Sequence, residues 1–417
     1  MRIVDVCAFY TPAGGGVRTY VEAKLSAAAR FGHEVIIVAP GLHHETVRRG
    51  PGAFLVTVPS PQLPVDRRYR YFADEAALHG VLDVWQPDHV EASSPWWSAT
   101  MVGRWRGAAT RSLVMHCDPL AAYAYRWFGG IVSTATIDRL FGWFWSHLRS
   151  LGRMFDAVIC PNRQLTDRLR SGGIRNVETN RLGVEADVFS PCLRCHDLRA
   201  AILGSLGLDS SGILLIGVGR LSAEKRWDMV LRAVRESAKR NDIGLLLVGD
   251  GPKRRRLELL TAHMASAAIL PSPTDRRELA RLMASADALV HGCEAETFCL
   301  VAAEAHASGI PLIVPDRGAA AGHAATGADI TYRAGDERAL ERAIGAFMDL
   351  RGDLQSSAAS RASAVRTMDE HFAELFDRYA SLFPGSRPIR SFTHGAPVDA
   401  EPLPQLALAR SSHFDRR

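Results

Sequence analysis

Short apolar runs alternate with longer amphipathic segments along most of the chain, and the alternation occurs twice. The first set of apolar runs comprises Arg2 to Phe9, Glu34 to Ala39, Phe54 to Val58, Asp88 to Ala92, Ser112 to His116 and Asp156 to Cys160. The second set comprises Gly212 to Val218, Gly244 to Gly249, Ala267 to Leu270, Asp287 to His291 and Ile310 to Val314. Such runs are typical of buried strands, and the segments between them, such as Val17 to Phe31, are typical of helices. The pattern predicts an α/β fold with parallel sheets, arranged as two doubly wound, Rossmann-like domains in tandem.

The boundary between the two sets lies at Leu182 to Pro191, where turn residues and a proline interrupt both periodicities. A chain of 417 residues is also long enough for two cores, because single cores stop growing at about 250 to 300 residues. We therefore expect a first domain over residues 1–184, a linker over 185–195 and a second domain over 196–368. Apolar residues recur at helical spacing over 369–383, and the proline-rich remainder, 384–417, is expected to be a disordered tail.

Composition argues against several function classes. The net charge of +5 is small and its basic residues are dispersed, which argues against a nucleic-acid partner. Seven cysteines without a regular framework are expected of a protein in a reducing cytoplasm. No apolar stretch reaches the roughly 18 residues of a membrane span, and the N-terminus has no signal-peptide pattern. We expect a cytoplasmic protein, with attachment to the inner face of the membrane as an option.

The segment Cys192 to His196 matches a pattern for covalent haem attachment. Such attachment belongs to exported proteins, so a chance pair of cysteines in a linker is the favoured interpretation. A zinc site would need further ligands at suitable spacing, and the sequence offers none that is obvious.

Two carboxylates, Glu296 and Glu304, stand eight positions apart directly after the apolar run that ends at His291. The order strand, turn and helix is expected here, with the helix over Phe298 to His306. Ligands of open α/β sheets bind at such strand ends, and the first turn of a helix suits an anion such as a diphosphate. The glutamates would instead accept hydrogen bonds from neutral hydroxyls, such as those of a ribose and a hexose. The alternative is two solvated glutamates beside an ordinary helix.

Three consecutive glycines, Gly14, Gly15 and Gly16, follow the first predicted strand and precede a helix. They allow a ligand to approach the backbone closely. A dinucleotide-binding fingerprint would have glycine where Thr19 stands and an acidic residue at the end of the second strand, so a nicotinamide dehydrogenase is not expected. The alternative is a turn needed only for tight packing of the strand against the helix.

Two cations and a histidine complete the set of candidates. Arg220 and Lys225 lie on the loop after the first strand of the second domain, where they would neutralise a leaving diphosphate in place of a metal ion. His116 ends a strand of the first domain, where it would bind a substrate hydroxyl or act as acid or base, unless its role is structural. No metal-ligand cluster and no nucleophile–base pair is identifiable, so we expect neither a metal nor another cofactor.

At this point the chain resembles the family 4 glycosyltransferases, which are retaining enzymes of the GT-B fold that use nucleotide sugars. The resemblance covers about residues 1–383. Its motifs are Gly14 to Val17, His116, Gly219 to Leu221 with Glu224 and Lys225, Val248 to Pro252, and Glu296 to Phe298 with Glu304.

The resemblance implies a role for each candidate residue. Arg220 and Lys225 would hold the donor diphosphate, and Glu304 the ribose of the nucleotide. Glu296 and the amides near Phe298, Cys299 and Leu300 would hold the transferred sugar and the β-phosphate, with His116 near the reaction centre. The loop with Gly15 and Gly16 would approach the diphosphate from the first domain, which the helix over 369–383 would complete.

Two departures from the family pattern concern the donor pocket. Cys299 stands where the family usually has glycine, which is expected to crowd the sugar pocket. Pro271 stands where a glycine often precedes the base pocket, so base recognition is not predicted from the sequence. Rival interpretations are a sugar-nucleotide epimerase of the same fold and an inactive binding protein.

The expected reaction moves a hexose from GDP-mannose or a UDP-hexose to a hydroxyl of a lipid or saccharide acceptor. Aromatic pairs and runs of the first domain, Trp96 with Trp97 and Phe141 to Trp145, accompany basic clusters at Arg67 to Arg70 and Arg104 to Arg106. Basic and aromatic residues suit an anionic membrane surface, so this region is a candidate surface for a lipid-linked acceptor. The alternative is that the aromatic residues belong to the core.

Overall fold

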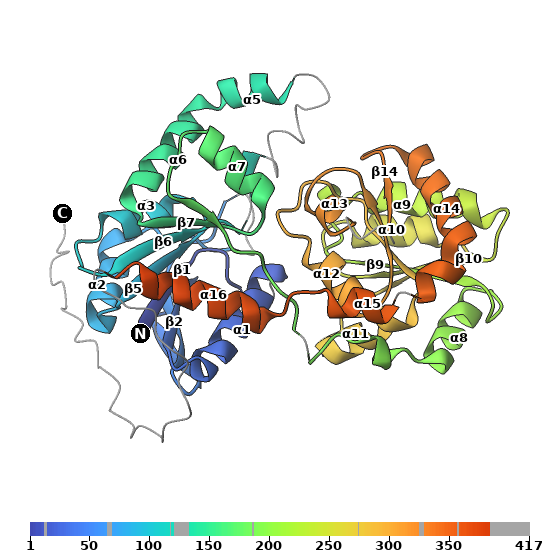
Figure 1. Ribbon diagram of the computed structural model, residues 1–417, viewed down its shortest axis with the longest axis horizontal. Coiled ribbons are helices and arrows are strands. Elements are labelled where there is room, and N and C mark those ends of the chain that lie inside the picture. Colours follow the sequence, from blue (N-terminus) through green and yellow to red (C-terminus); the bar gives the residue numbers. More distant parts are fainter. Residues whose placement is uncertain are drawn as a thin grey trace, which may run out of the picture.

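Figure 1 shows two α/β lobes joined by two chain crossings in this computed structural model. The structure describes residues 1–11, 15–64, 69–116, 118–120, 133–185, 187–273, 275–324, 329–356 and 358–383. The predicted tail over 384–417, Gly14, Arg67 and Arg68 lie outside these residues. No helix among the described residues is long and apolar enough to cross a bilayer.

The sheet of the first lobe has the strand order β3-β4-β2-β1-β5-β6-β7-β8. Its strands are β1 (Arg2–Cys7), β2 (Glu34–Gly41), β3 (Glu45–Gly50), β4 (Ala53–Pro59), β5 (His89–Ser93), β6 (Thr110–Val114), β7 (Ala157–Cys160) and β8 (Val177–Thr179). The helices are α1 (Gly16–Arg30), α2 (Glu75–Trp85), α3 (Trp97–Arg104), α5 (Thr134–Leu140), α6 (Gly142–Met154) and α7 (Arg163–Ser171). All neighbouring strands pair in parallel except β3 and β4, which are antiparallel.

The second lobe has the strand order β11-β10-β9-β12-β13-β14, and its strands pair in parallel. Its strands are β9 (Ile213–Val218), β10 (Ile243–Val248), β11 (Ala267–Leu270), β12 (Ala288–Val290), β13 (Leu312–Pro315) and β14 (Ile330–Tyr332). Its helices are η2 (Pro191–Leu193), α8 (His196–Ser205), η3 (Ala223–Lys225), α9 (Trp227–Ala238), α10 (Arg254–Thr261), α11 (Arg276–Ser285), α12 (Leu300–Ala307), α13 (Ala319–His323), α14 (Glu337–Ser356) and α15 (Ala358–Ser363). The predicted fold, two doubly wound domains, is confirmed.

Each sheet is buried on both faces, as a doubly wound sheet requires. Along β1, Val4 and Val6 join one core while Ile3 and Cys7 join the core on the opposite face. The second sheet likewise separates two apolar clusters. The antiparallel edge strand β3 was not predicted because it is mostly exposed and carries the sequence ETVRRG, so it has no apolar run.

The last helix, α16 (Met368–Ser381), leaves the second lobe and packs on the first. Phe372, Phe376 and Tyr379 are buried in the first lobe together with residues of α1, β1 and β2. Thr367 caps the helix through a reciprocal pair of bonds with Glu370, so the helix begins where the chain has crossed. This crossing helix therefore supplies part of the first lobe's core (Figure 1).

The two chain crossings are bonded to each other. The amide of Val184 donates to the carbonyl of Arg366, and the amide of Met368 donates to the carbonyl of Val184, both at 2.9 Å. A Cβ atom at Gly183 would overlap the carbonyl of Thr367. Glycine at this position thus allows the two crossings to touch.

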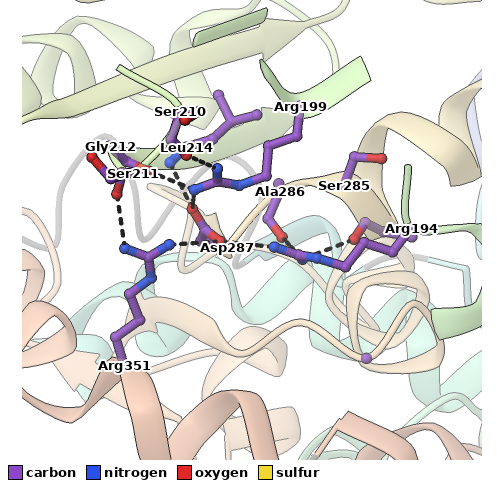
Figure 2. A network of polar contacts seen from close by, with 12 residues as sticks. Arg194, Arg199, Ser210, Ser211, Gly212, Leu214, Ser285, Ala286, Asp287 and Arg351 are labelled. Atoms are coloured by element: carbon purple, nitrogen blue, oxygen red, sulfur yellow. Dashed lines mark hydrogen bonds and ion pairs between the residues drawn. The ribbon is translucent and has the colours of Figure 1, made fainter. Parts of the chain in front are cut away.

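The segment that follows the first crossing is fixed to the second lobe by a buried aspartate (Figure 2). Asp287 accepts hydrogen bonds from the Leu214 amide at 2.9 Å, from Arg199 at 2.7 Å and from Arg194 at 3.0 Å, and Arg351 lies 3.5 Å away. Arg199 holds the pKa of Asp287 below its ordinary value despite the burial that raises it. Arg194 belongs to the predicted linker, which at this point is therefore part of the second lobe.

Candidate active site

The carboxyl ends of β9 and β12 bring Lys225 and Glu296 together, as the sequence predicted for one cleft. Lys225 ends η3, and its ammonium donates a hydrogen bond to Glu296 on the loop between β12 and α12. Burial alone would raise the pKa of Glu296, but Lys225 and the neighbouring His291 outweigh it and hold that pKa well below its ordinary value. Burial lowers the pKa of Lys225, and Glu296 raises it above its ordinary value by more. The two side chains form a charged pair at neutral pH.

The helix after this loop begins two residues later than predicted. It starts at Leu300 because Cys299, its N-cap, has a left-handed backbone with φ of 61°. Glycine adopts this conformation without strain, whereas a non-glycine residue there costs about 1 to 2 kcal/mol. The predicted start at Phe298 is therefore wrong. Cys299, which departs from the glycine usual in the family, occupies a position where the backbone conformation favours glycine. The thiol is buried in the core of the second lobe.

The backbone around Phe298 is held in place from α13. The carbonyl of Phe298 is bonded to Nε2 of His323 at 2.6 Å, and the two rings meet edge to face at 5.0 Å. Before α13, Gly318 has φ of 82°, and a Cβ there would overlap the carbonyl of Glu294. The loop that carries Glu296 and Thr297 therefore rests on this glycine turn.

Arg220 lies on the loop after β9, two residues beyond the end of that strand. Its guanidinium donates to Glu224 at 3.0 Å and is nearly half exposed. The preceding Gly219 has φ of 145° and packs so closely against Gly249 that a Cβ on Gly249 would overlap its carbonyl. Close contact between these loops at the ends of β9 and β10 explains why glycines recur in both motifs.

Glu304 is buried on α12 and has a partner that the sequence did not reveal. Arg276, at the start of α11, donates to Oε1 of Glu304 at 2.7 Å and to Oε2 of Glu185 at 2.7 Å, and its guanidinium stacks over Phe189. Burial raises the pKa of Glu304, and Arg276 offsets part of this. Arg276 lies outside the strand–turn–helix unit that carries Glu304, and it belongs to none of the motifs of the resemblance. No sequence signal therefore pointed to it.

His116 lies two residues beyond β6, on the first-lobe side of the site. Its Nε2 is 3.1 Å from Oγ of Ser93, and its ring meets Tyr20 edge to face at 4.8 Å. The pKa of His116 is lowered to about 4, mainly by burial; Asp5 opposes this shift and Lys24 adds to it. The histidine is neutral at physiological pH.

Thr297 joins the two lobes at the site. Its hydroxyl donates to the carbonyl of His116 at 2.7 Å, and its own carbonyl accepts from the side chain of Asn162, the N-cap of α7. Thr297 stands between Glu296 and Phe298, so the bond places His116 beside the Glu296 loop. Its bridging role was not predicted, because it depends on tertiary contact across 181 positions.

The glycines Gly15 and Gly16 at the start of α1 face open space. A Cβ atom added to either would meet nothing within 4 Å. Tight packing therefore does not require glycine at these positions, and the alternative that assigned them to packing loses its support. Of the other predicted site residues, Arg220 lies on the loop after β9, and Glu304 lies within α12.

One group of side chains has the composition of a metal site. His291, Glu296 and Cys299 offer ligand atoms that all lie within 4.8 Å of one another. The Lys225 ammonium is already bonded to Glu296 there, so a cation compensates this carboxylate without a metal. Among the described residues no other such group of three occurs, and Cys192, Cys195 and His196 do not form one.

Comparison with known proteins agrees with the geometry. The model of the glycosyl transferase 4-like domain matches residues 15–191, and that of glycosyl transferases group 1 matches residues 199–364. A GDP-mannose-dependent alpha-(1-6)-phosphatidylinositol dimannoside mannosyltransferase of Mycobacterium tuberculosis is 30% identical over 321 residues, which are 75% of this chain and 79% of the relative. A GDP-mannose-dependent alpha-mannosyltransferase of Corynebacterium glutamicum is 28% identical over 327 residues, 76% of this chain and 73% of the relative.

Among solved structures, sucrose-phosphate synthase from Thermosynechococcus elongatus superposes with a TM-score of 0.72 at 19% identity, over 92% of this chain and all of that chain. This likeness concerns the fold, which is the GT-B fold that the sequence resemblance implied. The two lobes, the Lys225–Glu296 pair at the carboxyl ends of the second sheet and the family matches over both lobes lead to one conclusion. The chain belongs to family 4 of the glycosyltransferases and is a GT-B enzyme that uses a nucleotide sugar.

Proposed function

We propose that this glycosyltransferase moves a mannosyl group from GDP-mannose to a hydroxyl of a phosphatidylinositol mannoside or a similar glycolipid. The observation that carries the proposal is the 30% identity, over 79% of its length, with a mannosyltransferase that its name assigns to GDP-mannose and a phosphatidylinositol dimannoside. The Corynebacterium relative is also named for GDP-mannose. The family matches cover both lobes, and the match over 199–364 includes Arg220, Lys225, Glu296 and Glu304.

In this proposal the second lobe holds the donor. Arg220 and Lys225 neutralise the diphosphate, and Glu304 accepts hydrogen bonds from the ribose hydroxyls through the oxygen that Arg276 leaves available. Glu296, turned into the site by Lys225, accepts from hydroxyls of the sugar. The start of α12 at Leu300 directs its first N–H groups toward the β-phosphate. The loop with Gly15 and Gly16 approaches the diphosphate from the first lobe.

The reaction we propose retains the anomeric configuration. The acceptor hydroxyl attacks the anomeric carbon from the face that the diphosphate leaves, so a bond to the acceptor oxygen forms as the bond to the phosphate oxygen breaks. A phosphate oxygen takes the hydroxyl proton, and the products are the glycoside and GDP. The residues at the site position the substrates and neutralise the charge of the leaving diphosphate, and no protein nucleophile takes part.

We further propose that the reaction needs no metal ion. A divalent ion in related chemistry neutralises the leaving diphosphate. Here two fixed cations, Arg220 and Lys225, follow β9 beside the proposed donor site. In addition, the Lys225 ammonium is bonded to Glu296, the carboxylate of the group formed by His291, Glu296 and Cys299.

A donor panel tests the function. Purified protein is incubated with GDP-mannose, UDP-glucose and UDP-galactose, each with and without a phosphatidylinositol mannoside, and release of nucleoside diphosphate is measured. Acceptor-dependent release from GDP-mannose alone is the expected result. An epimerase would convert the sugar nucleotide without release, and a binding protein would return it intact, so either outcome would contradict the proposal. The variant Lys225→Ala serves as the inactive control.

We also propose that the first lobe docks on an anionic membrane surface to reach its lipid acceptor. Three apolar side chains, Trp97 on α3, Leu140 on α5 and Trp143 on α6, are 54%, 69% and 66% exposed. We call these three residues, with the exposed Arg104 and Arg106, the aromatic–basic face. The helices α3 and α6 pack together, and α5 contacts α6, so the three helices that carry these residues are neighbours on one side of the lobe (Figure 1). Amphipathic aromatic rings and cations suit an anionic interface.

The sequence left open whether these aromatic residues belong to the core, and burial differs from one residue to the next. Phe144 and Trp145 are buried in the core, whereas Trp97 and Trp143 are exposed, and the Arg104 guanidinium lies 5.5 Å above the Trp97 ring. Arg67 and Arg68 are outside the described residues.

Sedimentation with vesicles tests the docking. Wild-type protein and the double variant Trp97→Ser/Trp143→Ser are mixed with vesicles that contain either only neutral lipid or a fraction of phosphatidylinositol. We expect binding to the anionic vesicles, weakened by salt and by the double substitution. Leu259→Ser is the matched control, because Leu259 is 66% exposed on α10 of the second lobe. Equal binding by the double variant and this control would refute the assigned face.

A further inference from the structure

The ring of His116 contacts a buried polar cluster of the first lobe through its Nε2 atom. Its Nε2 lies 3.1 Å from Oγ of Ser93, the last residue of β5, which is 1% exposed. Oγ of Ser93 lies in turn 2.7 Å from Oδ1 of Asp5 on β1 and 3.2 Å from Oε1 of Glu91. The serine hydroxyl therefore stands between the histidine and two carboxylates.

The carboxylates are held by groups that are themselves fully buried. The ammonium of Lys24 donates to Oδ2 of Asp5 at 3.0 Å and to Oε2 of Glu91, and the hydroxyl of Tyr379 on α16 also donates to Oε2 of Glu91. Burial and the neighbouring Asp5 raise the pKa of Glu91 to about 7, against the opposing effect of Lys24. Buried polar groups are costly unless every member is bonded, so the cluster fixes the direction of each bond.

The donors and acceptors of the cluster determine where the hydroxyl proton of Ser93 goes. A carboxylate only accepts, and a serine hydroxyl has one proton to donate. Ser93 gives that proton to Asp5, its nearest partner, so its oxygen accepts from His116. Nε2 of the neutral His116 ring must then carry the hydrogen, which leaves the lone pair on Nδ1.

We propose that Ser93 is a positioning residue that fixes His116 as the Nε2–H tautomer, so that Nδ1 is presented to the donor sugar as a hydrogen-bond acceptor. The inference rests on the proposed function only in placing the donor sugar at His116. The hydroxyl of Ser93 is held in one orientation by the cluster of Asp5, Lys24 and Glu91. A sugar hydroxyl that donates to Nδ1 would be the feature of the donor that this arrangement selects.

The experiment compares two buried serines that each bond a histidine. Ser93→Ala removes the proposed positioning hydroxyl. Ser112→Ala is the matched control, because Ser112 on β6 is 0% exposed and its Oγ lies 2.8 Å from Nε2 of His89. Ser93→Thr keeps the hydroxyl. Each protein is labelled with ¹⁵N-histidine, and long-range ¹H–¹⁵N spectra of the ring nitrogens, assigned with a His116→Gln sample, report the tautomer without any donor present.

Turnover and GDP affinity are measured on the same four proteins. In wild type the spectrum should show the Nε2–H form of His116. In Ser93→Ala the pattern should change, turnover at saturating donor should fall about 2-fold to 12-fold, as expected for the loss of one hydrogen bond, and GDP affinity should stay within about 2-fold. Ser112→Ala should leave the His116 signals and turnover unchanged, and Ser93→Thr should restore most of both.

Two results would overturn the inference. One is a wild-type His116 with its hydrogen on Nδ1, and the other is a turnover of Ser93→Ala equal to that of Ser112→Ala. If the donor panel identifies another nucleotide sugar, the turnover comparison is made with that donor and the spectra stand as they are. Failure of GDP-mannose as donor is thus distinguishable from failure of the tautomer assignment.

Discussion

The hydroxyl of Thr297, in the second lobe, donates a 2.7 Å hydrogen bond to the backbone carbonyl of His116 in the first. This bond joins the loop that carries Glu296 to the loop that carries the histidine. The acceptor is a backbone carbonyl, so the bond does not depend on the histidine side chain, whereas it does require the hydroxyl of residue 297.

Thr297→Val should loosen this contact while keeping the shape of the side chain. A neutral hydrogen bond contributes about 0.5 to 1.5 kcal/mol, so turnover should fall by about 2-fold to 12-fold if the bond stabilises the closed, reactive arrangement. GDP affinity should change little, because the nucleotide is assigned to the second lobe. Steady-state kinetics on Thr297→Val and on the surface control Thr261→Val would check this. Unchanged turnover in the first variant would show that the bond has no part in the reaction.

Glu304 and Glu296 should respond differently to replacement by alanine. If Glu304 binds the ribose, its loss removes charged hydrogen bonds of roughly 1.5 to 3 kcal/mol each, so GDP should bind about 10-fold to 150-fold more weakly. Glu296→Ala should lose turnover but bind GDP nearly as before, because this carboxylate is assigned to the transferred sugar, which GDP lacks.

Titration calorimetry with GDP, alongside turnover, separates these outcomes. Glu258→Ala, on the exposed surface of α10, is the control for loss of a carboxylate. Tight GDP binding by Glu304→Ala, or equal losses in both glutamate variants, would contradict the division of roles.

Activity should survive exhaustive chelation. Arg220 and Lys225 are proposed to neutralise the leaving diphosphate, and Lys225 already occupies the carboxylate of the group formed by His291, Glu296 and Cys299. Turnover is measured before and after dialysis against EDTA, with readdition of magnesium or manganese. Activity that disappears on chelation and returns with either ion would refute metal independence.

Removal of the crossing helix should be far more damaging than removal of the tail. A chain that ends at Thr367 lacks Phe372, Phe376 and Tyr379, each of which is buried in the first lobe. Complete loss of a buried aromatic side chain costs about 3 to 5 kcal/mol, so the truncated chain should be insoluble or inactive. A chain that ends at Phe383 should keep its activity. Solubility and turnover of the two truncations are the measurements, and an active chain ending at Thr367 would exclude a role for α16.

Stability should fall as the pH is lowered from 6.5 toward 4. Burial lowers the pKa of His371 to about 3 and that of His116 to about 4, with a bond from His371 to the Arg181 carbonyl offsetting part of the first shift. In this range the unfolded chain binds protons that the folded chain does not, so stability is present above pH 6.5 and is lost below it.

Each such histidine contributes up to about 1.4 kcal/mol per pH unit. Chemical denaturation at several pH values should therefore show a flatter pH dependence for His371→Gln than for wild type. His263→Gln, at an exposed position, is the control and should retain the wild-type slope. A slope that His371→Gln leaves unchanged would mean that this histidine is not the titrating group.

Periodicity predicted the two lobes because burial on both faces makes central strands uniformly apolar. It failed at β3, where an exposed edge strand has no such run. It also placed the start of α12 at Phe298, since a left-handed Cys299 leaves no trace in an apolar pattern. Local sequence determines core strands well and the conformation of single residues poorly.

The candidate site divides in the same way. Lys225 and Glu296 were predicted because each follows a strand at the same edge of one sheet, and the structure bonds them. Arg276, Thr297 and Ser93 were missed because their partners lie 28, 181 and 23 positions away and no motif records the contact. Motifs identify residues that touch ligands more readily than residues that hold them.

The bonded crossings at Val184 and Met368 have a mechanical consequence for the enzyme. Because the outgoing and returning segments are tied to each other, they form one two-stranded tether that cannot lengthen on one side alone. Any movement of one lobe relative to the other must therefore bend or twist both segments together. Gly183 keeps the two segments within bonding distance, since any side chain there would force them apart.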